Sequence, residues 1–317
     1  MCSTYLPTAF ACDNNSDYAS SQYATRKKAK SVRVQHHRAH IYAAMAEHGI
    51  TAPALGVAWD GAGAGDDGMI WGGEFFFVDE QSARRVAHFS PFPLPGGEAA
   101  MRDTRRAAFG MMHEAVKADP TLRNEFIERL GIGHKRAAVY EIMIDQQVNA
   151  PSTTSVGRLF DGVAAILQLR QENSFEGEAA MTMEFTAENS TIGDTYPLHL
   201  HDVGDDAPLI LDWRPMLGAL LADLRADTSI SDASRKFHNT LAKSIAQCAK
   251  RLGLQNIVLS GGCFQNRVLL ETTREYLHQE GCSPYWPQRS PPNDGGLSLG
   301  QIYGAMRALL SEAGRCV

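Results

Sequence analysis

The chain has 317 residues, enough for about two domains or lobes at roughly 150 residues each, so a small disulfide-stapled scaffold is excluded. Thirty Lys and Arg against 36 Asp and Glu give a net charge of −6, which does not favour binding to nucleic acid or to a membrane surface. No apolar stretch approaches the roughly 18 residues that cross a bilayer, no secretory signal is visible, and the six cysteines form no C-x-x-C pair. We therefore expect a cytoplasmic protein.

The first part of the chain predicts one helix between short strands. Residues 1–30 have no clear periodicity and are expected to be largely irregular. Apolar residues alternate with polar ones at 32–34, which predicts a short strand. Small and apolar residues recur at helical spacing over 36–47, and Gly49 follows as a typical helix end. The sequence thus predicts a helix that begins at a run of histidines.

Further along, three strands form a predicted meander at 54–59, 69–78 and 85–89, with a glycine- and aspartate-rich turn at 60–68. The rest of the chain is predicted to be mainly helical, with one buried strand. Helices are predicted at 98–117, 121–130, 136–147, 230–252, 267–279 and 297–310, with a buried strand at 256–260.

The densest pattern that suggests chemistry is V-Q-H-H-R-A-H. His36 and His40 are four residues apart, so on a helix their imidazoles share a face and can share a metal ion. Asp60 ends a predicted strand and Asp294 ends a Pro-Asn turn, positions where strand and helix ends converge in α/β proteins. Two histidines with two carboxylates suit Fe, Zn or Mn. The spacing alone also fits histidines that merely cap a helix.

Two glycine-rich segments are candidates for binding an anion. In D-G-A-G-A-G, Gly61 and Gly63 would let consecutive N–H groups cradle a phosphate, or the segment is simply a flexible turn. In S-G-G-C-F-Q-N, Gly261 and Gly262 separate a strand from a helix whose N-terminus can hold a phosphate, and Asn266 can reach a sugar or a base. A plain strand-to-helix turn is the alternative.

Two acidic positions are ambiguous when taken alone. Asp161, near the start of a predicted helix, could accept hydrogen bonds from a ribose or could only favour the helix dipole. Glu178 belongs to F-E-G-E-A-A, which places two carboxylates around a glycine.

Taken in order, these segments resemble the C-terminal carbamoyltransferase domain of HypF, the NiFe-hydrogenase maturation protein. Antibiotic O-carbamoyltransferases and TsaD-type tRNA threonylcarbamoyl transferases are more distant resemblances. The likeness runs from about Tyr18 to Leu310, and residues 1–17 are expected to lie outside it. The motifs are V-Q-H-H-R-A-H, W-D-G-A-G-A-G, W-G-G-E, L-P-G-G-E-A-A, S-V-G-R-L-F-D-G, F-E-G-E-A-A, S-G-G-C-F-Q-N-R and N-D-G-G-L-S-L-G-Q.

The resemblance implies an α/β fold of the actin, Hsp70 and sugar-kinase type, with two lobes around a nucleotide cleft and a first lobe shortened at its N-terminus. We expect residues 1–88 to form the rest of that lobe, with the metal-binding helix and the glycine-rich hairpin. Residues 89–295 would form the second lobe, with a helical insertion at about 98–150, and residues 296–317 a helix returning to the first lobe.

The resemblance also implies roles for single residues. His36, His40, Asp60 and Asp294 match the metal-binding and catalytic positions of the family. The positions that match its adenylate-binding residues are Gly157, Asp161, Glu178, Gly261, Gly262 and Asn266. Gly61 and Gly63 stay phosphate candidates on the glycine pattern alone. The implied cofactors are a divalent ion, Fe or Zn, and an adenine nucleotide.

The implied reaction is carbamoyl transfer from carbamoyl-adenylate to the C-terminal cysteine thiolate of a HypE-like partner. The YrdC-like domain that makes this adenylate in HypF is absent from the 317 residues, so it is expected on another chain or in a missing part of this one. Two alternatives stay open. One is an O-carbamoyltransferase acting on a small-molecule hydroxyl, and the other is an incomplete fragment that only docks a partner.

Overall fold

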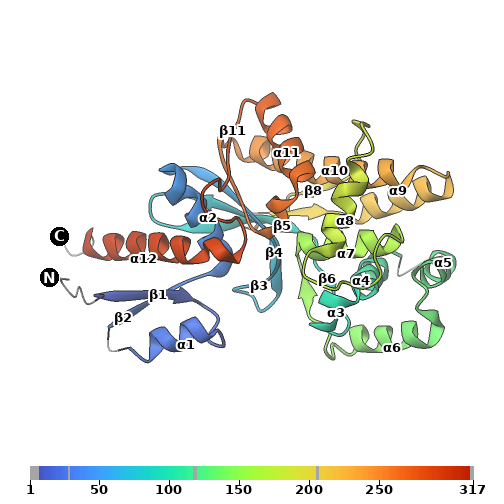
Figure 1. The fold of residues 1–317 in the computed structure, drawn as a ribbon, viewed down its shortest axis with the longest axis horizontal. Helices are drawn as coiled ribbons and strands as arrows, with labels where there is room; N and C mark the ends of the chain where they lie inside the picture. The colour runs from blue at the N-terminus through green and yellow to red at the C-terminus, as the bar shows by residue number, and fades with distance from the viewer. Residues whose placement is uncertain (1–6, 28, 117–119, 205–206, 315–317) are drawn as a thin grey trace.

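A central mixed sheet organises the protein (Figure 1). The computed structural model describes residues 7–27, 29–116, 120–204 and 207–314. The main path of the sheet runs in the order β11-β10-β3-β4-β5-β9-β8, and β6 and β7 pair beside it. The strands are β3 (Ala54–Ala64), β4 (Ile70–Val78), β5 (Ala83–Phe89), β6 (Phe92–Pro93), β7 (Ser152–Thr153), β8 (His199–His201), β9 (Leu209–Asp212), β10 (Asn256–Ser260) and β11 (Ser283–Tyr285).

Residues 9–13 and 19–25 form regular elements, contrary to the expectation that residues 1–30 are largely irregular; residues 1–6 and 28 lie outside the described residues. Strand β1 (Ala9–Asp13) pairs in parallel with β2 (Lys30–Val34), and helix α1 (Ala19–Thr25) connects them. The short strand predicted at 32–34 is confirmed within β2. The prediction failed for β1 because five residues carry little periodicity, and a partner strand distant in sequence supplies the hydrogen bonds.

Helix α2 (His36–His48) is the predicted histidine helix, and it is buried along most of its length. The Gln35 side chain accepts a hydrogen bond from the backbone N–H of Arg38 at 3.0 Å, which caps its first turn. Gly49 ends it with a φ of +61°, a conformation that glycine adopts without strain. The helix therefore begins at the first histidine because a capping side chain precedes it.

The C-terminal helix α12 (Leu297–Gly314) packs on α2 and on the β1–β2 pair (Figure 1). A Cβ atom at Gly300 would lie 1.8 Å from the carbonyl oxygen of Ala39, so a side chain there is excluded. The two backbones meet at this glycine, which ties the last helix directly to the histidine helix.

The glycine-rich segment is mostly strand, which corrects the predicted turn at 60–68. β3 continues through Asp60 to Ala64, and its register against β4 shifts between Trp59 and Gly63. After this bulge β3 pairs with β4 again at Gly63 and Ala64, so the strand extends beyond the regular ladder that ends at Trp59. Asp60 is therefore held by a sheet and does not lie on a loose turn.

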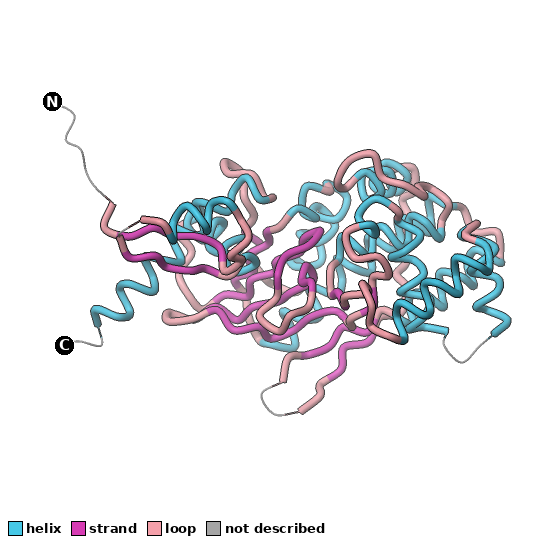
Figure 2. The backbone as a smooth tube through the Cα atoms, turned by 90° about the horizontal axis from the view of Figure 1, so that it is seen from below, coloured by secondary structure: helices cyan, strands magenta, loops and turns pink. Residues whose placement is uncertain are grey.

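Apart from α1, α2 and α12, which lie on the side of the two termini, the helices gather toward the opposite end of the molecule, with the strands running through the middle (Figure 1, Figure 2). They are α3 (Ala99–Arg102), α4 (Thr104–Val116), α5 (Pro120–Leu130), α6 (Gly133–Asp145), α7 (Val156–Ile166), α8 (Glu178–Ala187), α9 (Arg214–Arg225), α10 (Ile230–Leu252) and α11 (Arg267–Gln279), with two short turns η1 (Gly262–Gln265) and η2 (Asp294–Gly296). The predicted helices at 230–252 and 267–279 and the strand at 256–260 begin and end at the expected residues. Among the described residues, no helix is both long and apolar enough to cross a membrane.

This is the predicted α/β class of fold. The sheet contains strands from both sides of residue 88, and the domain limits expected from the sequence stay a prediction.

Candidate functional site

Four side chains from three distant segments converge at the N-terminal end of α2. Ligand atoms of His36, His40, Asp60 and Asp294 all lie within 4.8 Å of one another. Oδ2 of Asp60 is 3.2 Å from Nε2 of His36 and 3.4 Å from Nε2 of His40. Oδ1 of Asp294 is 3.5 Å from each of the same two nitrogens. The turn that carries Asp294, near the end of the chain, therefore lies over the N-terminal end of α2.

This cluster fits a divalent ion because of its types of ligand atom and because one buried nitrogen lacks a hydrogen bond. Nε2 of His40 is buried and makes no hydrogen bond to any residue that the structure describes, although carboxylate oxygens of Asp60 and Asp294 lie within 3.5 Å of it. Two imidazole nitrogens and two carboxylate oxygens are a donor set that Zn, Fe and Mn accept. The side chain of Asp294 is 67 % exposed, so one face of the cluster is open.

The electrostatics of the cluster favour a cation. Burial by itself lowers the pKa of His36, but hydrogen bonds to Asp13, Asp294 and Asp60 outweigh it and raise that pKa to about 12. His36 and His40 in turn hold the pKa of the Asp60 carboxyl well below its ordinary value despite burial. The carboxylates are therefore ionised, and a divalent ion can replace the protons on the imidazoles.

Sequence reasoning missed Asp13, which supports the cluster from β1. Its Oδ2 lies 3.3 Å from Nδ1 of His36, and both residues are 1 % exposed. A carboxylate on one imidazole nitrogen fixes the ring and its tautomer, so the other nitrogen points at the ligand position. Asp13 was missed because its segment was expected to be irregular.

A cavity of about 320 Å³ adjoins the cluster, a size suited to a small-molecule ligand. Both Asp60 and Asp294 belong to its wall. Of the residues expected to bind nucleotide, the wall contains Gly61, Gly157, Asp161 and Gly262, but it does not contain Gly63, Glu178, Gly261 or Asn266. The wall also contains Glu176 and Gly177 of the F-E-G-E-A-A segment, together with Ala62, Arg158, Ala180, Cys263, Gln265, Asn293 and Gly295.

The two glycines outside the wall serve close packing. A Cβ at Gly63 would lie 2.6 Å from the ring of His37 and 2.8 Å from that of His36, so this glycine lets β3 pack on α2. Gly261 has a φ of +102°, and a Cβ there would lie 2.2 Å from the carbonyl oxygen of Trp59. Both glycines therefore allow the close packing that holds the strands next to the cluster, and neither lines the cavity.

Polar groups of the other two residues are already engaged. Asn266 accepts a hydrogen bond from the N–H of Leu269 at 2.9 Å as the cap of α11, and its amide nitrogen lies 2.9 Å from Nε2 of His238. The Glu178 carboxylate contacts Arg170 and accepts a hydrogen bond from the N–H of Ser174. Each residue stabilises the wall behind the cavity.

Helix α7 supplies a buried ion pair to the cavity. Nη2 of Arg158 lies 3.0 Å from Oδ2 of Asp161, and the two residues are 3 % and 1 % exposed. Burial raises the pKa of Asp161, although Arg158 and Asn173 act in the opposite direction. The hydroxyl oxygen of Ser155, the cap of α7, lies 2.7 Å from the carbonyl oxygens of Asp60 and Gly61. The start of α7 is thereby fastened to the strand that carries Asp60.

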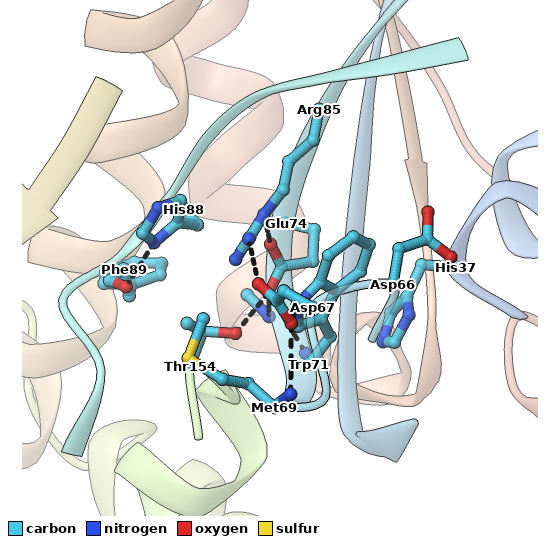
Figure 3. Close-up of polar contacts among 12 residues, drawn as sticks. His37, Asp66, Asp67, Met69, Trp71, Glu74, Arg85, His88, Phe89 and Thr154 are labelled. Carbon is cyan, nitrogen blue, oxygen red and sulfur yellow. Dashed lines mark hydrogen bonds and ion pairs between the residues drawn. The ribbon is translucent and has the colours of Figure 1, made fainter. Parts of the chain in front are cut away.

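A second buried carboxylate stiffens the same wall from behind (Figure 3). Glu74 on β4 is fully buried and contacts Nε of Arg85 and the hydroxyl of Thr154. Burial raises its pKa, and Arg85 only partly offsets this. The Asp67 carboxylate also contacts this arginine: its Oδ2 lies 2.9 Å from Nη1 of Arg85, and its Oδ1 lies 2.8 Å from Nε1 of Trp71. Since Thr154 precedes the cap of α7, the network links β4 and β5 to the cavity wall.

Comparison with known proteins places this fold in the Kae1-like class. A family model described as "Carbamoyltransferase, Kae1-like Domain, second subdomain" matches residues 56–301, and one described as "HypF Kae1-like domain" matches residues 2–47. The chain belongs to the HypF family. The match from residue 2 shows that the expectation for residues 1–17 was wrong, because the segment containing β1 is part of the family domain.

Curated relatives agree with this assignment. The chain is 36 % identical to "Carbamoyltransferase HypF" of Synechocystis sp. over 96 % of its length, which is 41 % of that protein. It is 33 % identical to "Carbamoyltransferase HypF homolog" of Cupriavidus necator over 94 % of its length, which is 78 % of that protein. It thus spans about two fifths of the Synechocystis relative.

A solved structure is also similar. A crystal structure of full-length HypF "in the phosphate- and nucleotide-bound form" is 34 % identical, with a TM-score of 0.88 over 96 % of this chain and 39 % of the other. The HypF of T. kodakarensis, 24 % identical with a TM-score of 0.81, shares the fold.

Proposed function

We propose that this chain transfers a carbamoyl group from carbamoyl-adenylate to the C-terminal cysteine thiolate of a HypE-like partner during NiFe-hydrogenase maturation. One observation carries the proposal: the cluster of His36, His40, Asp60 and Asp294 opens onto the cavity through its two carboxylates. An ion on the cluster and an adenylate in the cavity would therefore be neighbours. The names of the relatives support the class of reaction.

Each part of the site has a role in this reaction. His36, His40, Asp60 and Asp294 would hold a divalent ion, Fe or Zn, which when bound polarises a carbonyl as a Lewis acid. Gly61, Gly157 and Gly262 let the backbone approach the phosphate closely, and the buried guanidinium of Arg158 supplies positive charge at the same wall.

The adenylate is held so that AMP can leave. We assign Asp161, which lies in the cavity wall, as an acceptor for ribose hydroxyls. A YrdC-like domain on another chain, or elsewhere in a longer protein, would supply the adenylate. We assign the reaction to the cytoplasm, where the thiols of Cys12, Cys248, Cys263 and Cys282, which are free here, stay reduced.

Two other functions make different predictions. A small-molecule O-carbamoyltransferase has the same site but accepts a hydroxyl compound. A partner-docking module binds neither nucleotide nor metal, and the cavity beside the cluster argues against it.

The decisive experiment supplies the adenylate and follows the acceptor. The purified chain is incubated with a YrdC-like protein, ATP, carbamoyl phosphate and a HypE-like protein, and the acceptor is analysed by intact mass. We expect one carbamoyl group on the acceptor, AMP release that depends on this chain, and neither with Asp294→Asn. Carbamoylation of a hydroxyl compound alone would identify the O-transferase. If neither acceptor reacts and calorimetry with AMP and Zn²⁺ shows no binding, the docking module is correct.

A further inference from the structure

Glu47 lies near the end of α2 and binds the loop that leads to Asp294. Its side chain is 6 % exposed. Oε1 accepts hydrogen bonds from the backbone N–H groups of Gln288 at 2.7 Å and Arg289 at 2.8 Å. Oε2 accepts one from the N–H of Ser290 at 2.9 Å and one from its hydroxyl at 2.6 Å. One carboxylate therefore receives four donors from three consecutive residues.

Helical geometry puts Glu47 on the same face as the candidate metal ligands. Residues 36, 40 and 47 are spaced by four and seven, so they follow one stripe along a helix. Seven residues at 1.5 Å each separate Glu47 from His40 by about 10 Å along the axis. The segment from Gln288 to Asp294 thus follows this stripe, with Glu47 at one end and the two histidines at the other.

Little freedom remains in the loop between these two contacts. Two of the three residues between Ser290 and Asp294 are prolines, whose φ is fixed by the ring. The carbonyl oxygen of Pro292 accepts a hydrogen bond from the N–H of Gly261 at 2.9 Å. The side chain of Asn293 accepts one from the N–H of Gly295 at 3.1 Å. A constraint at Ser290 is therefore passed on to Asp294.

The carboxylate stays charged in this environment. Burial acts to raise the pKa of Glu47, but the hydrogen bonds from Ser290, Gln288 and Arg289 outweigh it and lower that pKa to about 2. Hydrogen bonds to an ionised acceptor are about twice as strong as neutral ones. The loop is thus held at neutral pH without any ion in the cluster.

We propose that Glu47 is a positioning residue that places Asp294 over His36 and His40 before the ion binds. This inference rests on the metal centre of the proposed function. Glu47 does not touch the cluster and acts through the loop. Helix α2 then contributes two ligands directly and orders a third one through its far end.

The test is a double-mutant cycle on metal affinity. Glu47→Gln puts an amide NH₂ against backbone donors while keeping the size of the side chain. We expect it to weaken Zn²⁺ binding, measured by calorimetry on the full chain, by about 10- to 100-fold, the range typical of residues that orient ligands. Asp294→Asn should weaken binding as well, and the double variant should bind within about twofold of Asp294→Asn alone. Independent, multiplying losses would overturn the proposal.

A matched control removes a similar carboxylate elsewhere. Asp79, at the turn between β4 and β5, also accepts backbone N–H groups, from Gln81 at 2.8 Å and Ser82 at 2.7 Å. Asp79→Asn should leave Zn²⁺ affinity unchanged, because its loop carries no ligand. An equal loss in both variants would mean that Glu47 acts only through general stability, which contradicts the proposal.

A second measurement needs no metal. Hydrogen exchange in the metal-free protein, followed on a peptide spanning 286–296, should be faster in Glu47→Gln than in the wild type, and unchanged protection would overturn the proposal. If Glu47→Gln does not fold, Ser290→Ala removes one of the four hydrogen bonds and should show the same effects at smaller size. Should the wild type bind no Zn²⁺, the metal centre is wrong, while the exchange result still decides whether Glu47 orders the loop.

Discussion

Asp13 and His36 form a buried carboxylate–imidazole pair, with Oδ2 of Asp13 3.3 Å from Nδ1 of His36. The other ring nitrogen, Nε2, is thereby directed at Asp60 and Asp294. The pair joins the first strand of the described chain to the cluster on α2.

Replacing Asp13 should weaken the site without removing a ligand. Asp13→Asn keeps the shape but loses the charge that fixes the ring of His36, so Zn²⁺ affinity should fall by about 10- to 100-fold in calorimetry. Asp17→Asn changes an exposed carboxylate nearby and serves as the control. Equal affinities of Asp13→Asn and the wild type would contradict the orienting role.

Removing either histidine should abolish tight metal binding. His36→Ala and His40→Ala each delete a nitrogen ligand, so the metal content of purified protein, measured by elemental analysis, should fall below one tenth of the wild-type value. His278→Ala on the exposed end of α11 is the control and should retain the wild-type content. Retention of metal by both cluster variants would show that the ion lies elsewhere.

A substitution at Asp294 tests both the metal site and the placement of the turn that carries this residue. Asp294→Asn keeps the shape and removes the anionic oxygen, so metal binding and the proposed carbamoyl transfer should weaken. Because the side chain is 67 % exposed, the Tm of the metal-free protein should stay within a few degrees of the wild type. Unchanged metal affinity in Asp294→Asn would exclude Asp294 as a ligand.

The two glycines of the strand-to-helix turn should fail in different ways. Gly262 lines the cavity and donates its N–H to Oδ1 of Asp60 at 3.1 Å, so Gly262→Val should block AMP binding in calorimetry while the chain still melts cooperatively. Gly261→Ala places a Cβ against the backbone of Trp59 at a positive φ, so it should lower stability by several kcal/mol. Normal AMP affinity in Gly262→Val would show that this turn takes no part in nucleotide binding.

Glu47 predicts a particular pH dependence of stability. Its pKa is lowered from 4.5 to about 2 in the folded chain, so its stabilising effect is present above pH 4.5 and is lost as pH falls toward 2. The difference in free energy of unfolding between wild type and Glu47→Gln should therefore shrink between pH 5 and pH 3. Urea titrations in the presence of a chelator measure it. A difference that does not change with pH would contradict this assignment.

Local patterns were enough to predict much of the fold. The helix at 36–47, the long helix at 230–252 and the strand at 256–260 all carry strong periodicity or clear caps, and these segments were confirmed. β1 was missed because its hydrogen bonds come from β2, about twenty residues further along the chain. The extension of β3 was missed because its glycines are typical of a turn, although Gly63 and Ala64 pair with Trp71 and Ile70 of the next strand.

The candidate site divides along the same line. His36 and His40 share a helix face, a relation that the spacing reveals directly. Asp13 and Glu47 could not be found this way, since each acts on a segment with which it shares no sequence pattern. Asn266 matched a family position, yet its side chain caps α11, and only the geometry shows this.

The contact between Ala39 and Gly300 has a consequence for the order in which the molecule is made. During synthesis on a ribosome, α2 leaves the exit tunnel long before the turn that carries Asp294. Until then the face of α2 that α12 will cover is open, and the four-residue cluster lacks one member. The full set of four candidate ligands can therefore form only after Asp294 has left the tunnel, when most of the described chain has been translated.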